Sequence, residues 1–363
     1  MEKVDIAIIG AGVIGLAIAR ELSKSHQNVV VLEKNPKFGQ ETSSRNSEVI
    51  HSGIYYPSQM LKTRLCIEGN QLLYEFCKEH RITHYRIGKL IIANDESEME
   101  RLESLLKRAR EHNLEIQEMG KRQVGQMEPD VLAEYALFLP NTGIIHSYGY
   151  LQSLYYLARE QGVIFLFNTA LQGLEYNGKD YILHTPVERI KADRLVNAAG
   201  LHAEAIPRWL GMDLDKSGYR LHPCKGEYFK INKKLKINHL IYPLPGQYGL
   251  GIHLTKDTYG NFRLGPNTHY VEEIDYSVNE EHQKEFFQAA RRYLPFLEFD
   301  HLSPDFAGIR PKLQAPHEQE TRDFVISEET GKGFPGLLNL LGIESPGLTA
   351  SLAIARLAAK LLQ

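Results

Sequence analysis

Three glycines near the start of the chain have the spacing of a dinucleotide-binding turn. Gly10, Gly12 and Gly15 follow an apolar run typical of a buried strand, and apolar residues at helical spacing come after them. Gly10 permits a tight turn, Gly12 leaves room for a pyrophosphate at the helix N-terminus, and Gly15 lets helix and strand pack closely. A second predicted strand ends in Glu33, whose carboxylate can accept hydrogen bonds from a ribose 2′-OH and repels a 2′-phosphate. The pattern therefore predicts a dinucleotide other than NADP.

The loop at residues 42–57 is rich in hydrogen-bonding groups and poor in residues that could form a core. Its candidate cofactor contacts, for a diphosphate and for a flat ring, are Ser43, Ser44, Arg45, Ser52 and Gly53. His51 places an imidazole beside this backbone. A lone histidine is usually structural, but the crowding of polar residues after a nucleotide motif favours a functional role.

Two more turns of small residues follow apolar strands later in the chain. Residues 195–200 end in Ala199 and Gly200, where backbone could approach a cofactor, although a tight packing corner would look the same. The second turn precedes the C-terminal helix, and its candidate contacts are Gly342, Ser345, Gly347, Leu348 and Thr349. A helix N-terminus stabilises negative charge, such as the charge near N1 and C2=O of a reduced flavin. An ordinary turn before a helix is the alternative.

The elements that must position these residues alternate between two kinds of segment. Strands and helices of nucleotide-domain type are expected at residues 163–167, 181–184, 337–341 and 148–161, and from Gly347 onward. Residues 219–266 have a pattern of strands and turns, and helices are expected at 96–113 and 279–293. Because 363 residues exceed the size at which one core usually stops growing, we expect two interleaved domains of an α/β protein.

The composition excludes several classes of function. A net charge of −3 with interspersed signs gives no reason to expect nucleic acid. The three cysteines have no metal-ligand spacing, which favours free thiols in a reducing compartment and no metal. We expect no signal peptide and no transmembrane segment, because no stretch approaches the roughly 20 apolar residues needed to cross a bilayer. A cytoplasmic location is expected, with peripheral contact at the inner membrane as an open alternative.

The motifs together resemble the D-amino-acid-oxidase-like superfamily of FAD-dependent oxidoreductases, over nearly the whole chain. The resemblance rests on the turn at residues 10–15 with Glu33, the loop at 42–56, and residues 225–228, 251–255, 264–266, 308–310 and 342–351. It implies an extended FAD, bound noncovalently or covalently, with Ala170 near the adenine and Lys34 beside Glu33. It also implies a Rossmann-like FAD-binding domain at residues 1–80, 145–215 and 320–363, interleaved with a mixed, largely antiparallel β-sheet substrate domain at 81–144 and 216–319.

Within the superfamily, the resemblance is strongest to enzymes that oxidise L-2-hydroxyglutarate to 2-oxoglutarate. Such a reaction needs a carboxylate anchor and a base that takes the hydroxyl proton while hydride leaves Cα for flavin N5. Arg310 is the expected anchor, because guanidinium binds carboxylate bidentately. His51 and His253 are equal candidates for the base. The candidate contacts to a second carboxylate are Lys225, Tyr55, Tyr242 and Asn267.

Three other activities stay open from the sequence. A glycine oxidase-like amine or amino-acid oxidase needs the carboxylate anchor but no second cation. Glycerol-3-phosphate dehydrogenase is a weaker alternative, because the chain shows no basic cluster for a phosphoester. A flavin-binding subunit without turnover is the non-enzymatic alternative. The electron acceptor, dioxygen or quinone, and the oligomeric state are not determined by the sequence.

Overall fold

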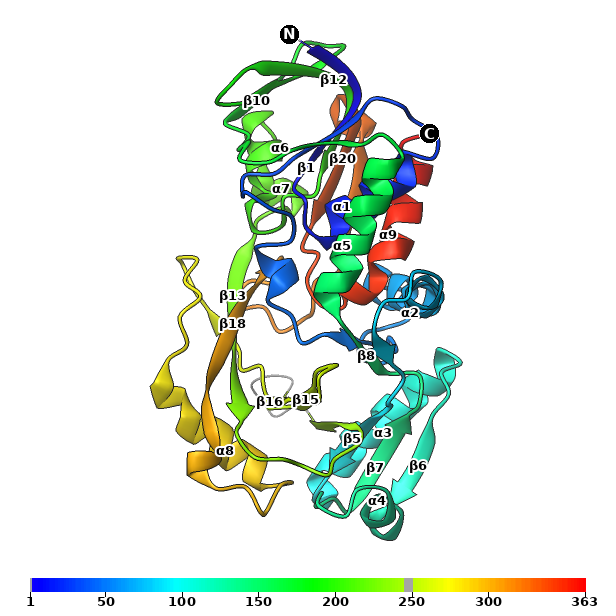
Figure 1. The fold of residues 1–363 in the computed structure, drawn as a ribbon, viewed down its shortest axis with the longest axis vertical. Helices are drawn as coiled ribbons and strands as arrows, with labels where there is room; N and C mark the ends of the chain where they lie inside the picture. Colours follow the sequence, from blue (N-terminus) through cyan, green and yellow to red (C-terminus); the bar gives the residue numbers. More distant parts are fainter. Residues whose placement is uncertain (1, 245–250) are drawn as a thin grey trace.

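A computed structural model describes residues 2–244 and 251–363, and its upper part is built on an eight-stranded sheet (Figure 1). At its centre, β1 (Glu2–Ile9) lies between β12 (Arg189–Asn197) and β2 (Val29–Leu32) and is parallel to both. The parallel pairing continues to β9 (Ile164–Leu166) beyond β2 and to β20 (Phe334–Leu341) beside β12. The antiparallel members are β10 (Gly173–Tyr176), β11 (Tyr181–His184) and β19 (Val325–Glu329).

Four helices cover one face of this sheet (Figure 1). They are α1 (Val13–Leu22), α2 (Leu61–Glu79), α5 (Ser147–Glu160) and α9 (Gly347–Leu361). Ile6 and Ile8 of β1 pack in the core that these helices form, whereas Ala7 and Ile9 pack in a second core with β10 and β11. Burial on both faces explains why this strand is a continuous apolar run.

The lower part of the molecule is a nine-stranded, largely antiparallel sheet (Figure 1). One half contains β13 (His222–Ile231), β16 (Phe262–Leu264), β17 (His269–Tyr270) and β18 (Leu302–Lys312). The other half contains β5 (Lys89–Ala93), β6 (Gln117–Gly120), β7 (Tyr135–Leu139), β14 (Leu240–Pro243) and β15 (Leu254–Lys256). Its associated helices are α3 (Glu96–Glu111), α4 (Lys121–Met127) and α8 (Gln283–Arg291).

Short elements join the two sheets. One of them is a three-stranded sheet of β3 (Val49–Ile50), β4 (His84–Tyr85) and β8 (Gly143–Ile145). Its first strand, β3, lies within the loop at residues 42–57. The remaining helical segments are α6 (Ala205–Trp209), α7 (Leu214–Ser217), η1 (Thr42–Ser44), η2 (Gly200–His202), η3 (Glu280–His282), η4 (Phe299–His301) and η5 (Thr330–Lys332). Among the described residues, no helix is both long and apolar enough to cross a membrane.

Local sequence explains where the predicted helices begin and end. The side chain of Asp95 accepts a hydrogen bond from the backbone N–H of Glu98 at the start of α3, which then ends with basic residues in its last turn. This helix and α5 confirm the predictions for residues 96–113 and 148–161 within two residues at each end. The predicted helix at 279–293 is divided into η3 and α8, and α2 was not predicted.

The architecture confirms the predicted fold class, a Rossmann-like α/β unit with a mixed, largely antiparallel second sheet. Strands of the first sheet come from residues 2–32, 164–197 and 325–341, and strands of the second from 89–139 and 222–312. This distribution supports the domain division proposed from the sequence, with residues 1–80, 145–215 and 320–363 in one domain. The exact boundaries of the two domains stay a prediction.

Candidate functional site

A cavity of about 500 Å³ lies at the carboxyl edge of the parallel strands. Because β1, β2, β9, β12 and β20 are mutually parallel, the turns that follow them meet at one edge of the sheet. Predicted residues that line the cavity are Gly10, Gly12, Glu33, Lys34, Ser43, Arg45, His51, Ala170, Ala199, Gly200, Arg310, Ser345, Gly347 and Leu348. The fold therefore brings together turns that lie near opposite ends of the chain.

The first glycine turn forms a cradle that larger residues would fill. Gly10 has φ +102°, and a Cβ there would lie 2.6 Å from Ala198 O. A Cβ on Gly15 would lie 1.9 Å from Gly10 O, so Gly15 serves the close packing of α1 rather than the cavity lining. Helix α1 begins without a side-chain cap at Gly12. A helix N-terminus behind small residues fits a pyrophosphate, although the N–H of Val13 already donates to Ser43 Oγ.

Glu33 lines the same cavity but already accepts two backbone hydrogen bonds. Its Oε2 accepts from the N–H of Ala11 at 2.8 Å, and its Oε1 accepts from the N–H of Asn35 at 2.9 Å. Each carboxylate oxygen keeps a second lone pair, so the predicted contact to a ribose hydroxyl is compatible with these bonds. Trp209 of α6 also lines the cavity, a position that was not predicted from the sequence.

The loop at residues 42–57 lies against β18. Thr42 Oγ1 donates a hydrogen bond to Ile309 O, and Arg45 Nη1 donates to Ala307 O at 3.3 Å. Ser43 Oγ accepts from the N–H of Val13 at the start of α1. Arg45 Nε is buried and has no hydrogen-bond partner among the described residues. A cavity-lining guanidinium with a vacant donor fits an anionic diphosphate.

Several predicted cofactor contacts lie outside the cavity lining: Gly15, Ser44, Ser52, Gly53, Gly342 and Thr349. Ser44 Oγ donates to Glu41 O, within its own turn. Thr349 Oγ1 accepts a hydrogen bond from the N–H of His51 at 3.0 Å and so joins the start of α9 to the histidine loop. These residues shape the backbone around the cavity, and direct contact of their side chains with the cofactor stays a prediction.

His51 lines the cavity as a neutral imidazole. Burial, together with the positive charge of Lys89, lowers the pKa of His51 to about 3. Its Nε2 lies 3.4 Å from Ser345 Oγ, near the N-terminus of α9. An imidazole that is unprotonated at neutral pH can accept a proton, which suits a general base.

His253 occupies a different position, although the sequence ranked the two histidines equally. It is buried and does not line the cavity. Its ring stacks on that of Tyr242, with the ring centres 3.6 Å apart. The structure therefore brings His51, rather than His253, to the cavity with Arg310.

Arg310 provides a guanidinium that forms no ion pair with any residue of the described chain. Its donors reach Thr268 Oγ1 at 3.5 Å and Asn267 O at 3.3 Å, both neutral acceptors. Although burial alone would lower the pKa of Arg310, neighbouring Cys224 and Tyr228 raise it, and the group stays charged. A half-buried guanidinium that forms no ion pair with a described carboxylate is an anion-binding group. The geometry agrees with the role predicted for Arg310.

The structure does not bring Lys225 to Arg310. In the pairing of β13 with β18, Cys224 is opposite Arg310 and Lys225 is opposite Ile309, so Lys225 points to the other face. Lys225 Nζ pairs instead with the exposed Asp275 at 3.0 Å. The sequence could not show this, because strand register decides which face a side chain takes.

Asn267 also differs from its predicted position. Its side chain makes two hydrogen bonds to Glu227, with Oδ1 accepting from the backbone N–H at 2.8 Å and Nδ2 donating to Oε2 at 2.9 Å. The backbone carbonyl of Asn267, not its side chain, contacts Arg310. Asn267 therefore supports the position of the guanidinium, and a substrate contact by its side chain is not evident.

Tyr55 and Tyr242 surround a residue that the sequence analysis missed. Lys89 Nζ lies 3.4 Å from Tyr55 Oη, and its distances to the ring centres of Tyr55 and Tyr242 are 4.5 Å and 4.7 Å. In the sequence, Lys89 only precedes an apolar strand, where a lysine usually extends its amine to solvent. The useful signal would have been the pairing of β5 with β14, which a local pattern does not contain.

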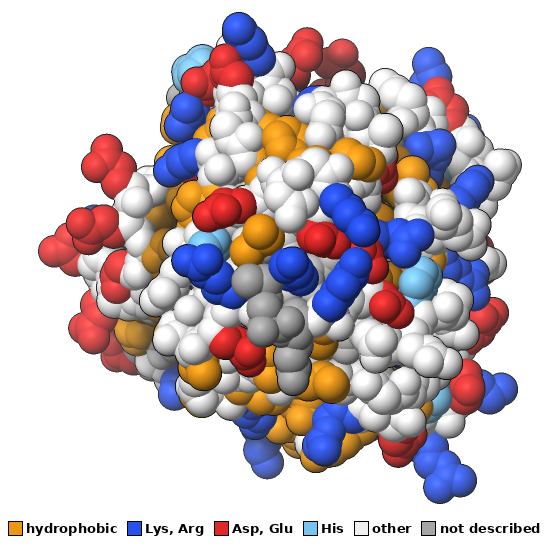
Figure 2. Space-filling view, turned by 90° about the horizontal axis from the view of Figure 1, so that it is seen from above, with side chains coloured by type: hydrophobic (Ala, Val, Ile, Leu, Met, Phe, Trp, Pro, Cys, Tyr) orange, Lys and Arg blue, Asp and Glu red, His pale blue; other side chains and the backbone are white. Residues whose placement is uncertain are grey.

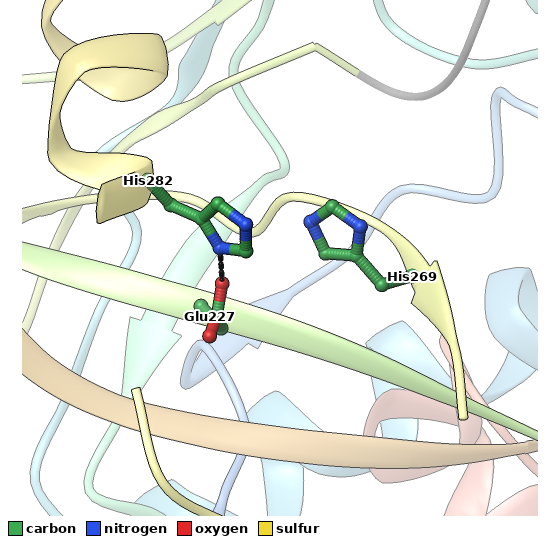
Figure 3. A group of neighbouring side chains, drawn as sticks. All are labelled: Glu227, His269 and His282. Atoms are coloured by element: carbon green, nitrogen blue, oxygen red, sulfur yellow. Dashed lines mark hydrogen bonds and ion pairs between the residues drawn. The ribbon is translucent and has the colours of Figure 1, made fainter. Parts of the chain in front are cut away.

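Glu227, His269 and His282 bring three potential metal-ligand atoms within 4.8 Å of one another (Figure 3). The carboxylate of Glu227 already accepts hydrogen bonds from His282 Nδ1, from Asn267 Nδ2 and from the backbone N–H of Asn279. The two imidazole rings are stacked, with centres 4.8 Å apart. Because the carboxylate has its donors without an ion, the cluster is explained as a hydrogen-bond network.

The end of the molecule that carries the first sheet shows no dominant charge. Figure 2 shows basic and acidic side chains interspersed over this face, with apolar and neutral side chains between them. This distribution agrees with the small net charge of −3 and provides no basic stripe that would follow a nucleic-acid backbone.

Comparisons with known proteins agree with this geometry. Residues 5–361 match the family model described as FAD dependent oxidoreductase. The mitochondrial L-2-hydroxyglutarate dehydrogenase of Arabidopsis thaliana is 37% identical, over 98% of this chain and 82% of the relative. Glycerol 3-phosphate dehydrogenase of Caloramator mitchellensis is 31% identical, over 97% of this chain and 72% of the relative.

A solved structure is also similar over the full chain. It is the L-alpha-glycerophosphate oxidase of Mycoplasma pneumoniae with FAD bound, which superposes with a TM-score of 0.89 at 27% identity. The similarity covers 100% of this chain and 95% of that one. The glycine cradle, the vacant Arg45 donor and the open start of α1 thus fit the cofactor that the family uses.

Proposed function

Since the chain belongs to the family of FAD-dependent oxidoreductases and FAD is its cofactor, we propose that it oxidises L-2-hydroxyglutarate to 2-oxoglutarate. The observation that carries this proposal is the 37% identity to an L-2-hydroxyglutarate dehydrogenase over 98% of the chain. The geometry agrees with it, because Arg310 places a charge without a carboxylate partner in the same cavity as a neutral histidine.

The proposed cofactor contacts follow from the cavity lining. Gly10, Gly12 and Ser43 would hold the pyrophosphate, with Arg45 donating to its oxygens. Glu33 would accept from the ribose and Ala170 would contact the adenine. FAD, when bound, would supply the two-electron acceptor for the oxidation of the substrate.

The proposed substrate contacts assign one role to each charged group. Arg310 holds the carboxylate beside the reacting carbon through two parallel N–H bonds. His51 Nε2 takes the proton of the hydroxyl group, which leaves the oxygen free to become the carbonyl of the product. An anionic substrate next to the imidazole raises the pKa of His51 from its low value and so strengthens the base at the moment of reaction.

His253 has a positioning role in this proposal. Its ring fixes the plane of Tyr242 by stacking, and Tyr242 in turn borders Lys89. Its substitution is expected to change substrate affinity more than the pH dependence of turnover, whereas substitution of His51 removes the base itself.

A second candidate, oxidation of glycerol 3-phosphate, is favoured by two of the comparisons. Both the Caloramator relative and the Mycoplasma structure are named for that substrate. A phosphoester has its charge at one end, whereas L-2-hydroxyglutarate has a carboxylate at each end. The position of Lys89, on a different strand from Arg310, fits the substrate with two separated charges.

The test is the product formed by purified holoenzyme with an artificial electron acceptor. L-2-hydroxyglutarate should yield 2-oxoglutarate with the highest kcat/KM, ahead of glycerol 3-phosphate, glycine and the D-enantiomer. Preferred turnover of glycerol 3-phosphate would replace the proposal by its second candidate, and preferred turnover of glycine would make the protein an amine oxidase.

The natural electron acceptor and the location are part of the same proposal. We propose that reduced enzyme is reoxidised by dioxygen or a quinone in the cytoplasm, with peripheral contact at the inner membrane if the acceptor is a quinone. Reoxidation of the reduced enzyme by a quinone analogue under anaerobic conditions, compared with reoxidation in air, distinguishes the two acceptors.

A further inference from the structure

Lys89 is a buried cation at the start of β5. It is 0% exposed and forms no ion pair with any residue in the ranges 2–244 and 251–363. Residues 245–250 have the sequence Pro-Gly-Gln-Tyr-Gly-Leu and contain no acid. Burial raises the pKa of Tyr55 and of Tyr242, so both neighbouring phenols are neutral and do not cancel the charge. The ammonium group therefore lies in the interior without a counter-charge.

Lys62 is a second buried lysine in this fold, and it differs from Lys89 in its pairing. It is also in contact with aromatic rings, those of Tyr56 and Phe324. Unlike Lys89, it forms an ion pair with Glu344, with Nζ 2.8 Å from Oε1, and both side chains are buried. A buried charge is costly unless it is paired. A lysine that stays buried and unpaired in the free protein is therefore a candidate for pairing with an anionic ligand.

The strand register places Lys89 on the same face of the sheet as Tyr242. Leu240 pairs with Lys89, and Tyr242 pairs with Ile91, so these side chains share one face of the sheet with Tyr55 above them. The charge of Lys89 lowers the pKa of His51, which lines the cavity. Tyr55, whose hydroxyl lies 3.4 Å from Lys89 Nζ, belongs to the same loop as His51, which lines the cavity with Arg310 of β18. Lys89 and Tyr55 are not themselves among the residues that line the cavity, so they adjoin it next to this loop.

We infer that Lys89, with the hydroxyl group of Tyr55, forms a subsite for the second carboxylate of a dicarboxylic 2-hydroxy acid. This inference rests on the proposed function and deepens it, because it assigns the group that distinguishes a dicarboxylate from a monocarboxylate. Arg310 binds the carboxylate next to the reacting carbon, and Lys89 binds the distal one. The second cation is thus Lys89 and not Lys225, which pairs with Asp275 on the opposite face of β13.

Binding at this subsite is expected to depend on pH. Burial lowers the pKa of Lys89 to about 7, and a bound carboxylate favours the protonated form. In the free protein, the other titratable groups that face Lys89 do not change charge between pH 5 and 9, because burial holds the pKa of His51 at about 3 and that of Cys66 at about 12, and keeps both phenols protonated. Dicarboxylate affinity should therefore fall above pH 7, toward about tenfold per pH unit.

The experiment uses the holoenzyme with Lys89→Met and two substrates, L-2-hydroxyglutarate and L-2-hydroxypentanoate, which has the same carbon chain without the distal carboxylate. For L-2-hydroxyglutarate, Lys89→Met should raise KM by about 30-fold or more, as expected for loss of a buried charge pair. For L-2-hydroxypentanoate, KM should stay within about twofold of wild type or fall. Lys225→Met, measured in parallel, should leave both values near those of wild type.

Equal loss for both substrates, or a larger effect of Lys225→Met, would overturn the subsite. Binding of glutarate, followed by the visible absorbance of the flavin, keeps the subsite testable apart from turnover. If wild type binds glutarate with the pH dependence given above but does not oxidise L-2-hydroxyglutarate, the proposed function fails and the dicarboxylate subsite stands. If glutarate binding is independent of pH between 6 and 9, the subsite is wrong even where Lys89→Met does not fold.

Discussion

The dinucleotide end of the cavity has a backbone turn at its centre, whereas the proposed substrate end depends on side chains of distant strands. At the first end, Gly10, Gly12 and the start of α1 form a cradle within a few residues of chain. At the second end, Arg310 and Lys89 come from β18 and β5, which lie on either side of four other strands of the sheet. A local motif can encode the first kind of site, and only tertiary pairing assembles the second.

The largest effect is expected from a change in the backbone cradle. Gly15→Val should abolish FAD binding and activity, because the added Cβ would lie 1.9 Å from Gly10 O. The matched control is Gly125→Val in α4, where a Cβ meets nothing within 4 Å. Flavin content of the purified proteins provides the measurement. Normal flavin in Gly15→Val would show that the turn is not the cofactor site.

The next effect is expected at the anion-binding guanidinium. Arg310→Met should lower kcat/KM for L-2-hydroxyglutarate by about 10²- to 10³-fold while flavin content is retained, because the carboxylate beside the reacting carbon loses its bidentate partner. Steady-state kinetics on the holoenzyme check this prediction. A change below tenfold would place the carboxylate anchor elsewhere.

A comparable loss of activity is expected when the proposed base, His51, is replaced. The pH profile of activity provides a further test of its role. His51→Asn should lower kcat by about 10²-fold or more, the usual contribution of a general base. Since burial and Lys89 lower the pKa of His51 to about 3, the free imidazole is neutral at every pH above that value. The pH profile of wild-type kcat/KM should therefore show no protonation of His51 near pH 6.5, and a limb at that pH that disappears in His51→Asn would contradict the account.

The two buried lysines should respond oppositely in stability. Lys62→Met should destabilise the protein by about 3 kcal/mol, because it leaves the buried carboxylate of Glu344 unpaired. Lys89→Met should leave the free protein as stable as wild type or more stable, since it removes a charge without a counter-charge. Thermal melts of the two variants test this contrast, and equal destabilisation would mean that Lys89 has a hidden structural partner.

The stability difference between wild type and Lys89→Met should also depend on pH, in a direction that the pKa of Lys89 determines. The pKa of Lys89 is lowered from 10.5 to about 7 in the folded state, so above pH 7 the unfolded chain binds a proton that the folded protein does not. Wild-type stability consequently gains from this group as pH rises from 7 toward 10.5. The advantage of Lys89→Met over wild type should shrink over the same interval, and an advantage that grows would refute the assignment.

The smallest effect is expected at Lys225. Lys225→Met should change stability by less than about 1 kcal/mol, because its partner Asp275 is exposed and such pairs contribute little. The midpoint of thermal unfolding measures this change. A larger shift would indicate that Lys225 is needed for the pairing of β13 and β17.

The sequence could predict the parts of this molecule that are encoded locally. The glycine turn, the helices at residues 96–113 and 148–161 and the final strand and helix all have periodicity or turn residues that specify them. Arg310 was predicted as the carboxylate anchor from its place two residues after Gly308, in a motif with family resemblance, and this role stays a prediction. These predictions depended on few long-range contacts.

The substrate end could not be predicted to the same depth. The sequence does not distinguish Lys225 from Lys89, because only the register of β13 with β18 and of β5 with β14 decides which face of the sheet each side chain takes. The side chains of Asn267 and Glu227 hold each other through contacts between separate strands. In the same way, the sequence could not show that His51 lines the cavity and that His253 stacks on Tyr242, because no local pattern contains these contacts.

The most direct test of the central claim is anaerobic reduction of the bound flavin, followed by its visible absorbance after rapid mixing. L-2-hydroxyglutarate should bleach the holoenzyme with a saturating dependence on concentration, at a higher ratio of rate constant to dissociation constant than L-2-hydroxypentanoate or glycerol 3-phosphate. A flavin that stays oxidised with L-2-hydroxyglutarate, or that glycerol 3-phosphate reduces more efficiently, would contradict the account.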